Sequence, residues 1–541
     1  MEHLEVLEYH LLTNSKNITK RLFLISLIFL YSTSFAQDLN KTFSLKETLK
    51  ANSSSFKILK LDKQKFVRGN YKVSTKIKRM DLLDKDKNFV RRLDTPLKLE
   101  GRFIFISKKA QNFYIKIQTL DKDIKYDLSV NKISDVFYDK KKSEEKILSK
   151  IIKEARKDLQ KKSSTKEFWQ RVKSVGTPLV ETIDENYSLI TFLYKGAKHN
   201  VRLLGAPTHE HVNLKQLKNS DIWYKSFKVK NGLALSYQVA PDVPSIKGSK
   251  RENRIAILAS AQVDPFNKTP YLISNAKIKD KHFQYSSFML KTEDNKWYEQ
   301  KNSPSGSLES FDFTSKLLKN KRKITVYKPH NYSRNINDYK LLFVFDGIEY
   351  QHKIQTPLIL DNLIHAKKIK PTLAVFIDNI SYKIRSWELP TNPKFADFMA
   401  KELLPYISKR FNIKNKAENT VLVGSSYGGL ASTYVAFQYP EVFGKVLSLS
   451  GSFWWHNNSG EPEWLSKEIS KNITKNITFY LNAGVYETGH YSIDILESNR
   501  HLRTLLKAKD YDVIYKEVQG SHDYFSWRLS LSDGLINLLN K

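Results

Sequence analysis

The apolar residues of this chain follow two patterns, one before residue 311 and one after it. In the first part apolar and polar residues alternate, most clearly in Phe113–Ile117, and polar turns separate short runs such as Phe56–Leu61 and Phe103–Ile106. Alternation with a period of two predicts strands with one buried face. After residue 311 the runs are continuously apolar and helical patterns separate them. Such runs are typical of a parallel, doubly wound α/β sheet.

These patterns predict a C-terminal α/β domain with a doubly wound, mostly parallel sheet, preceded by two mainly β, sandwich-like domains. A charged segment with an apolar helical stripe links the two β domains. The α/β strands are expected at Ile324–Tyr327, Leu341–Phe345, Leu373–Ile377, Thr420–Val423, Val446–Leu449, Ile477–Asn482 and Val513–Tyr515. The predicted boundaries are 1–37 for a signal peptide, 38–145 for a β module, 146–162 for the linking helix, 163–310 for a second β domain and 311–541 for the α/β domain.

The segment Val421–Gly429 carries the strongest chemical signal. An apolar strand runs into Gly424-Ser425-Ser426-Tyr427-Gly428, and a helical apolar pattern follows. This is the Gly-x-Ser-x-Gly nucleophile elbow of α/β-hydrolases, in which small residues flank a tight turn that exposes the serine. Ser426 is therefore the candidate nucleophile. The backbone N–H of Tyr427, at the start of the helix, is a candidate oxyanion donor.

A nucleophilic serine needs a base and an acid that orients the base, and on this fold both follow it in the chain. His522 lies in a loop after the late apolar run, which is the expected place for the base; His456, His490 and His501 have no such setting. Glu487 follows the preceding strand and is the candidate acid, with Asp494 as the fallback. The second oxyanion N–H is expected from Gly347 or Ile348, after the strand Leu341–Phe345.

Several segments together resemble the enterochelin esterase family, within the larger esterase group that also holds feruloyl esterases. In the α/β domain the matching segments are Asp346-Gly347, Arg385-Ser386-Trp387-Glu388-Leu389, Ser450–Trp455, Gly484–Glu487, Gly520-Ser521-His522-Asp523 and Trp527-Arg528. Upstream they are Phe168-Trp169, Gly176–Glu181, Ile190–Gly196, Asp221–Ser226 and Asp264–Asn267. The upstream matches separate enterochelin esterases from plain feruloyl or acetyl esterases.

The resemblance implies a serine esterase that opens the trilactone of a ferric tricatecholate siderophore through an acyl-enzyme. Arg385 would face the anionic catecholates, and Trp454 or Trp455 would offer an aromatic wall. The alternatives are an ion pair of Arg385 with Glu388, and a core position for at least one tryptophan. Two other functions stay open, namely a polysaccharide-directed feruloyl or acetyl esterase and a non-enzymatic binding module.

Composition adds less. Ninety Lys and Arg against 56 Asp and Glu give a formal charge of +34 over 541 residues, a field that would attract an anionic ligand. The lysines are spread along the chain and no nucleic-acid motif accompanies them, so no nucleic-acid partner is predicted. Cysteine is absent. The cluster His209-Glu210-His211 favours a solvated loop over a metal site, and neither a metal nor a cofactor is expected.

The amino end is typical of an export signal. Lys20 and Arg21 precede the apolar run Leu22–Tyr31, and small residues lead to Ala36, after which cleavage is expected. An uncleaved anchor is the alternative, although the run is short for a spanning helix. We therefore expect a periplasmic or secreted protein that is not inserted in the membrane once the signal has been removed.

Overall fold

The computed structural model describes residues 42–95, 98–138, 146–205, 207–208, 211–272, 280–290, 297–299, 302–336, 339–457, 460–489 and 494–540. The predicted signal segment lies outside these residues, as do His209, Glu210 and His490. The chain divides into two compact units, Met1–Phe137 with Pro244–Ala259, and Tyr138–Val243 with Ser260–Lys541. Among the described residues no helix is long and apolar enough to cross a bilayer.

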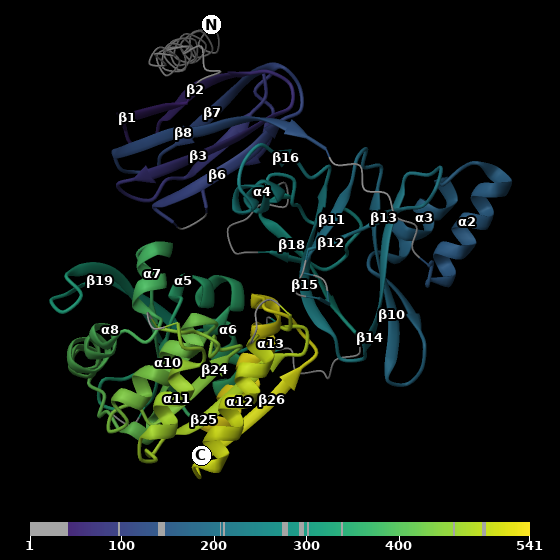
Figure 1. Ribbon diagram of the computed structural model, residues 1–541. Coiled ribbons are helices and arrows are strands. Elements are labelled where there is room, and N and C mark those ends of the chain that lie inside the picture. The colour runs from purple at the N-terminus through teal and green to yellow at the C-terminus, as the bar shows by residue number, and fades with distance from the viewer. Residues whose placement is uncertain are drawn as a thin grey trace, which may run out of the picture. The chain divides into compact units, whose positions relative to one another are not determined.

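The first unit is a β-sandwich, and alternation explains its core (Figure 1). One sheet has the order β1-β8-β3-β6 and the other β2-β7-β4-β5, with antiparallel pairing. Inward residues of both sheets, such as Leu59, Val67 and Ile115, share one apolar cluster. The strands are β1 Phe43–Leu49, β2 Ser54–Leu61, β3 Lys65–Val73, β4 Arg79–Leu83, β5 Phe89–Arg92, β6 Glu100–Ser107, β7 Gln111–Gln118 and β8 Ile124–Phe137.

A later segment of the chain returns to this sandwich. Strand β16 (Ser245–Ile246) pairs with the end of β8, and helix α4 (Lys250–Ile257) follows it. Lys132 Nζ lies 2.6 Å from Glu252 Oε1, and the Arg91 side chain donates to the carbonyl of Ala259. The sandwich unit is thus built from two separate stretches of sequence.

The second unit begins with an upstream β domain, by which we mean its described residues before 291. It holds one sheet of order β13-β14-β10-β9 and another of order β12-β11-β15-β18-β17. Helices α2 (Lys150–Lys162) and α3 (Lys166–Val175) precede them. The strands are β9 Leu179–Thr182, β10 Tyr187–Lys195, β11 Val201–Leu204, β12 Val212–Asn213, β13 Lys215–Gln216, β14 Ile222–Lys230, β15 Ala234–Pro241, β17 Pro270–Leu272 and β18 Gln284–Met289.

The α/β domain, from residue 302 onward, has a sheet of order β19-β20-β22-β21-β23-β24-β25-β26 in the described part of the chain. Pairing is antiparallel from β19 to β22 and parallel from β22 to β26. The strands are β19 Ser307–Ser315, β20 Asn320–Lys328, β21 Lys340–Val344, β22 Thr372–Ile377, β23 Thr420–Ser425, β24 Lys445–Leu449, β25 Thr478–Gly484 and β26 Asp512–Val518.

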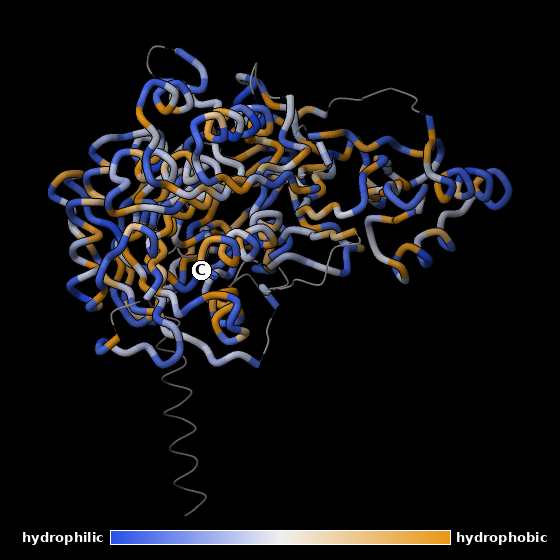
Figure 2. The backbone as a smooth tube through the Cα atoms, turned by 90° about the horizontal axis from the view of Figure 1, so that it is seen from below, coloured by the Kyte–Doolittle hydropathy of each residue, from blue (hydrophilic) through white to orange (hydrophobic). Residues whose placement is uncertain are grey.

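Helices cover both faces of this sheet. Figure 2 shows hydrophobic stretches alternating with hydrophilic ones along the chain. Leu430, Ile469 and Leu502 join the core on one face, whereas Ile359 and Leu531 join the core on the other. The helices are α5 Gly347–Glu349, η1 Tyr350–Ile354, α6 Thr356–His365, α7 Tyr382–Glu388, α8 Pro393–Asp397, η2 Phe398–Leu403, α9 Leu404–Phe411, η3 Ala417–Asn419, α10 Tyr427–Gln438, α11 Trp464–Lys471, α12 Ile495–Ala508 and α13 Tyr524–Leu539. The predicted fold class is confirmed.

One buried ion pair ties the antiparallel edge of this sheet to helix α7. The Arg322 side chain from β20 donates to both carboxylate oxygens of Glu388, at 3.0 and 2.5 Å, and both side chains are only 1% exposed. The guanidinium carbon also lies 5.0 Å from the centre of the Phe398 ring. Removing either partner would leave a charge in a site that water cannot reach.

We therefore expect Arg322→Met to destabilise the α/β domain by about 3–5 kcal/mol, because Glu388 would stay buried without its partner. The measurement is the urea midpoint of the transition that this domain contributes. Lys467→Met is the matched control, since Lys467 pairs with Glu461 on the surface and its loss should leave the midpoint in place. Equal midpoints for the two variants would contradict this account.

Candidate active site

The backbone at Ser426 is the most unusual feature of the α/β domain. Ser426 stands between β23 and α10 with φ 57° and ψ −123°, a combination that costs a non-glycine residue about 1–3 kcal/mol. A Cβ atom at Gly424 would lie 2.3 Å from the carbonyl carbon of Gly428, so only glycine fits the tight approach of strand and helix. The Ser426 N–H donates to the Leu449 carbonyl at 3.0 Å. The strained turn is held in place by the buried neighbouring strand.

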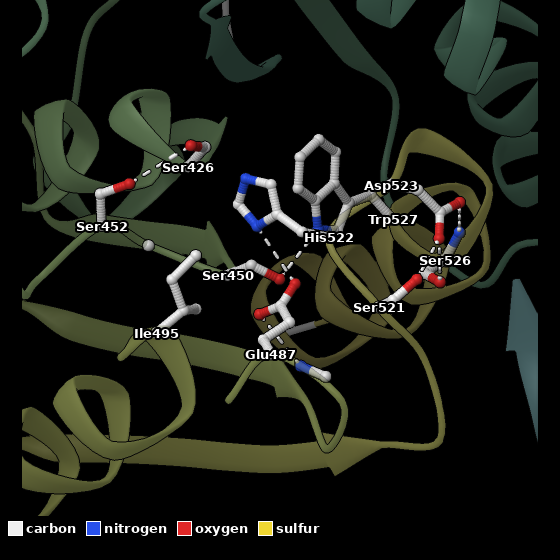
Figure 3. A network of polar contacts seen from close by, with 12 residues as sticks. Ser426, Ser450, Ser452, Glu487, Ile495, Ser521, His522, Asp523, Ser526 and Trp527 are labelled. Atoms are coloured by element: carbon white, nitrogen blue, oxygen red, sulfur yellow. Dashed lines mark hydrogen bonds and ion pairs between the residues drawn. The ribbon is translucent and has the colours of Figure 1, made fainter. Parts of the chain in front are cut away.

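Loops after the last two strands bring an imidazole and a carboxylate to this turn (Figure 3). His522 Nδ1 lies 3.2 Å from Glu487 Oε1. The Glu487 side chain is 1% exposed, whereas that of His522 is 38% exposed. A neutral imidazole that donates from Nδ1 to the carboxylate keeps Nε2 as a proton acceptor. Figure 3 shows that edge of the ring turned toward Ser426.

The Ser426 hydroxyl itself lies 3.2 Å from the Ser452 hydroxyl. In unliganded enzymes the hydrogen bond between nucleophile and base is often long and tightens only when substrate binds. The structure thus gathers the three predicted triad side chains into one region. Asp494, the fallback acid, caps helix α12 instead and accepts from the N–H groups of Glu497 and Gly489.

Trp527 contacts the imidazole on another side. Its ring stands edge-on to the His522 ring, with centroids 4.8 Å apart and an interplanar angle of 85°. Its indole N–H donates to Ser450 Oγ at 2.9 Å. The indole is therefore fixed and limits the positions open to the ring. The sequence assigns Trp527 no role beyond its motif, because the contact forms only when α13 folds over the site.

The residue after the base, Asp523, caps helix α13. Its carboxylate accepts from the N–H groups of Phe525 and Ser526 and from the hydroxyls of Ser521 and Ser236. The Ser526 Oγ also lies 3.1 Å from Asp523 Oδ2, but its single proton has a nearer acceptor in the Ala234 carbonyl, at 2.9 Å. Burial raises the pKa of Asp523, and these hydrogen bonds work in the opposite direction. Such a capped turn gives the neighbouring His522 a fixed backbone.

The candidate oxyanion donors start two helices that lie close together. Tyr427 is the first residue of α10, and Gly347 and Ile348 are the first two of α5. A Cβ atom at Gly428 would lie 3.4 Å from Asp346 Oδ2, which places the two turns side by side. A Cβ atom at Gly347 would lie 2.6 Å from Asp378 Oδ1, so glycine is required there. Backbone N–H groups at such turns suit a developing oxyanion.

Arg385 belongs to this cluster through a partner that the sequence did not indicate. Its Nε lies 2.5 Å from Asp346 Oδ1 and its Nη2 lies 2.7 Å from Asp346 Oδ2. The alternative pairing with Glu388 is wrong, because Glu388 is taken by Arg322. Burial works to lower the pKa of Arg385, but the charge of Asp346 outweighs it and raises the pKa. The guanidinium carbon lies 5.8 Å from the centre of the Tyr427 ring.

The two candidate aromatic residues differ in position. Trp454 is half-buried, and its ring centroid lies 6.3 Å from that of Tyr427. Trp455 packs against the apolar core of one face and meets Trp464 edge-on at 6.2 Å. Trp454 therefore lies beside the elbow, while Trp455 is partly buried against the core. Among the described residues no group of three His, Asp or Glu side chains could hold a metal ion.

Comparisons with known proteins match both domains of the second unit. Residues 189–292 match the family "Enterochelin esterase, N-terminal", and residues 315–538 match the family "Putative esterase". The chain is 27% identical over 409 residues to the Iron(III) enterobactin esterase of Dickeya dadantii, covering 69% of this chain and 92% of that protein. It is 26% identical over 395 residues to the Iron(III) salmochelin esterase of Escherichia coli O6:H1, covering 68% of this chain and 92% of that protein.

A solved structure shares the fold. The ferric enterobactin esterase of Salmonella typhimurium matches with a TM-score of 0.59 at 23% identity, over 69% of this chain and 98% of that one. The aligned portion leaves out about a third of this chain, in line with two matched domains and an additional sandwich.

A fluorophosphonate probe tests whether this geometry activates Ser426. We expect stoichiometric labelling of the native chain at one serine, because such probes react with a serine that a nearby base deprotonates. Ser426→Ala should abolish labelling and leave the thermal unfolding midpoint unchanged. His522→Ala should lower the labelling rate at least about a hundredfold.

Ser432→Ala is the control for this experiment, since the Ser432 hydroxyl lies on the same helix but only donates to the carbonyl of Gly428. It should label at the native rate. Undiminished labelling of Ser426→Ala, mapped to another serine by peptide mass, would show that the elbow is not the reactive site.

Proposed function

The chain belongs to the enterochelin esterase family and is a carboxylic-ester hydrolase, and we propose that it opens the trilactone of a ferric tricatecholate siderophore. Cleavage of the ester backbone separates the three catecholate arms. A hexadentate chelate then becomes a set of weaker ligands, so that iron is released more easily. Iron is part of the substrate in this proposal and not a cofactor of the protein.

The observation that carries the substrate class is the pairing of domains. The upstream β domain matches the amino-terminal family of enterochelin esterases, and the α/β domain matches the esterase family. Relatives that span both domains are named for enterobactin and salmochelin. A polysaccharide-directed feruloyl or acetyl esterase would need only the α/β domain. That function leaves the upstream β domain unexplained, so we rank it second.

The proposed mechanism uses the contacts around Ser426. The hydroxyl attacks a seryl ester carbonyl while His522 Nε2 accepts its proton, and Glu487 stabilises the imidazolium through Nδ1. The N–H of Tyr427 and that of Gly347 or Ile348 hold the oxyanion. His522 then protonates the leaving alkoxide, and water attacks the acyl-enzyme by the reverse sequence of proton transfers.

Substrate contacts follow from the same surroundings. Tyr427 and Trp454 offer adjacent, half-exposed rings on which a catechol ring could stack. The Arg385 guanidinium lies 5.8 Å from the centre of the Tyr427 ring and, being paired with Asp346, could offer its remaining N–H groups to an anionic substrate. The formal charge of +34 would attract a ferric tricatecholate, which is an anion.

Product analysis with ferric and iron-free tricatecholate trilactone tests the proposed substrate. We expect the native chain to convert the cyclic triester into linear trimer, dimer and monomer, separated by chromatography, and Ser426→Ala to leave it intact. Hydrolysis of short esters without any opening of the trilactone would reject the siderophore. Release of ferulate or acetate from plant cell-wall fragments would favour the second candidate.

We also propose that the protein acts outside the cytoplasm, in the periplasm or as a secreted protein. The support is the basic and apolar segment before Ala36. Expression of the full chain in a Gram-negative host should give a mature form that begins at Gln37, found by intact mass in the periplasmic fraction. Recovery of the unprocessed chain in the cytosol would contradict export, while recovery in the membrane would favour an anchor.

A further inference from the structure

The upstream β domain contacts the two loops that carry the acid and the base. Strand β15 begins beside the His522 loop: the Ala234 N–H donates to the Gln519 carbonyl at 2.8 Å, and Ser526 Oγ donates to the Ala234 carbonyl at 2.9 Å. Two residues along, Ser236 Oγ donates to Asp523 Oδ1 at 3.0 Å. Three hydrogen bonds thus join one strand to the turn on either side of the base.

The acid loop makes a separate contact with the same domain. Tyr486, the residue before Glu487, packs against the apolar cluster that includes Ile190, Trp223 and Leu235 of β10, β14 and β15. The Tyr486 N–H also lies 3.3 Å from the Gly520 carbonyl. The acid loop and the base loop therefore contact both each other and the upstream β domain.

These contacts leave little free space. A Cβ atom at Gly520 would lie 2.7 Å from Ser526 Oγ and 3.3 Å from the Ala234 carbonyl oxygen. The first turns of α13 are held in the same way: Phe525 shares an apolar cluster with Ala234 and Tyr271, and the Arg528 guanidinium carbon lies 4.4 Å from the centre of the Tyr271 ring. Movement of the base loop would disturb several close contacts at once.

The nucleophile is supported differently. In the described part of the chain the hydrogen bonds of Ser426 run to Leu430, Leu449 and Ser452, all within the α/β domain. Its strand β23 has a parallel strand on each side, whereas β26, which leads into the base loop, lies at the end of the sheet order. An edge strand has half the hydrogen-bonded support of a central one. The loop that carries His522 therefore has less support from the sheet than Ser426 has, and its contacts with β15 supply additional support.

We propose that Ser236 is a positioning residue. Through the hydrogen bond from Ser236 to Asp523, β15 keeps the imidazole of His522 in its position opposite Ser426. The upstream β domain is then a part of the catalytic apparatus in addition to any contact it makes with substrate. This inference rests on the catalytic roles of Ser426 and His522 in the proposed function, but not on the identity of the ester.

Ser236→Ala tests this role with a short chromogenic ester that is too small to reach from the elbow into the upstream β domain. We expect kcat to fall about tenfold with KM unchanged, because a misplacement of a catalytic group by about 1 Å can lower the rate about a hundredfold and a smaller displacement lowers it less. The same fall in kcat is expected for the siderophore ester. Ser236→Thr keeps a hydroxyl and should recover most of the rate.

Ser188→Ala is the matched control, since the buried Ser188 hydroxyl donates to Asn231 Oδ1 at 2.9 Å within the same domain. It should keep the native kcat. Tyr486→Leu provides an independent variant should Ser236→Ala unfold at the assay temperature, as judged by circular dichroism, and it too should lower kcat for the short ester.

Three results would overturn the inference. One is an unchanged kcat in both Ser236→Ala and Tyr486→Leu. Another is a rise of KM confined to the siderophore ester, which would make the domain a substrate-binding element only. The third is an equal loss in Ser188→Ala, which would indicate general destabilisation. If the native chain hydrolyses the short ester but not the trilactone, the proposed substrate fails while this test remains valid.

Discussion

The strained turn at Ser426 is the feature that the core of the α/β domain has to hold in place. A positive φ with an extended ψ is unfavourable for serine, and it persists only where the surroundings define the backbone completely. Strand β23 meets that condition, because every one of its residues is buried and it has parallel neighbours on both sides. Helix α10 meets it on the other side, being buried from Gly428 to Phe437. A rigid core therefore holds the serine hydroxyl clear of the sheet.

The other half of the site is built on less rigid elements. Glu487 and His522 come from loops after β25 and β26, at the end of the sheet order, and the His522 side chain keeps contact with solvent. A base must exchange protons, so complete burial would hinder it. Its position is then fixed by neighbours instead: Glu487 on Nδ1, Trp527 on the ring face and the capped turn of Asp523. The core thus fixes the position of Ser426, whereas contacts with neighbouring side chains fix the position of His522.

Local patterns explain what the sequence could predict. The elbow and the strands of the α/β sheet are visible because short apolar runs and glycines specify them within a few residues. Glu487 and His522 are predicted from their positions after strands. In the structure they contact each other, and Figure 3 shows the His522 ring turned toward Ser426. Strand β19 was not predicted, since most of its exposed residues are polar and only Ser315 is buried. The return of β16 and α4 to the sandwich left no signal, because it depends on pairing with a distant strand.

The side-chain pairings that the sequence did not predict are mostly contacts between residues far apart in the chain. The Asp346 partner of Arg385 lies 39 positions away, and the Ser236 partner of Asp523 lies 287 positions away. Neither spacing leaves a periodic pattern, whereas Glu388 stands three residues from Arg385 and looks like a natural partner on a helix. The local pairing failed because the Arg322 guanidinium from β20 occupies the Glu388 carboxylate in the core.

The pairing with Asp346 changes what Arg385 can do. A guanidinium has five N–H donors in a rigid plane, and Asp346 takes one on Nε and one on Nη2. The other three donors are not used in this ion pair, so Arg385 can fix the turn before Gly347 and still offer hydrogen bonds to an anion beside Tyr427. Because Asp346 neutralises its charge locally, its attraction for an anion must come from these directed bonds rather than from a free positive charge. Recognition of substrate and geometry of the oxyanion donors would then depend on a single side chain.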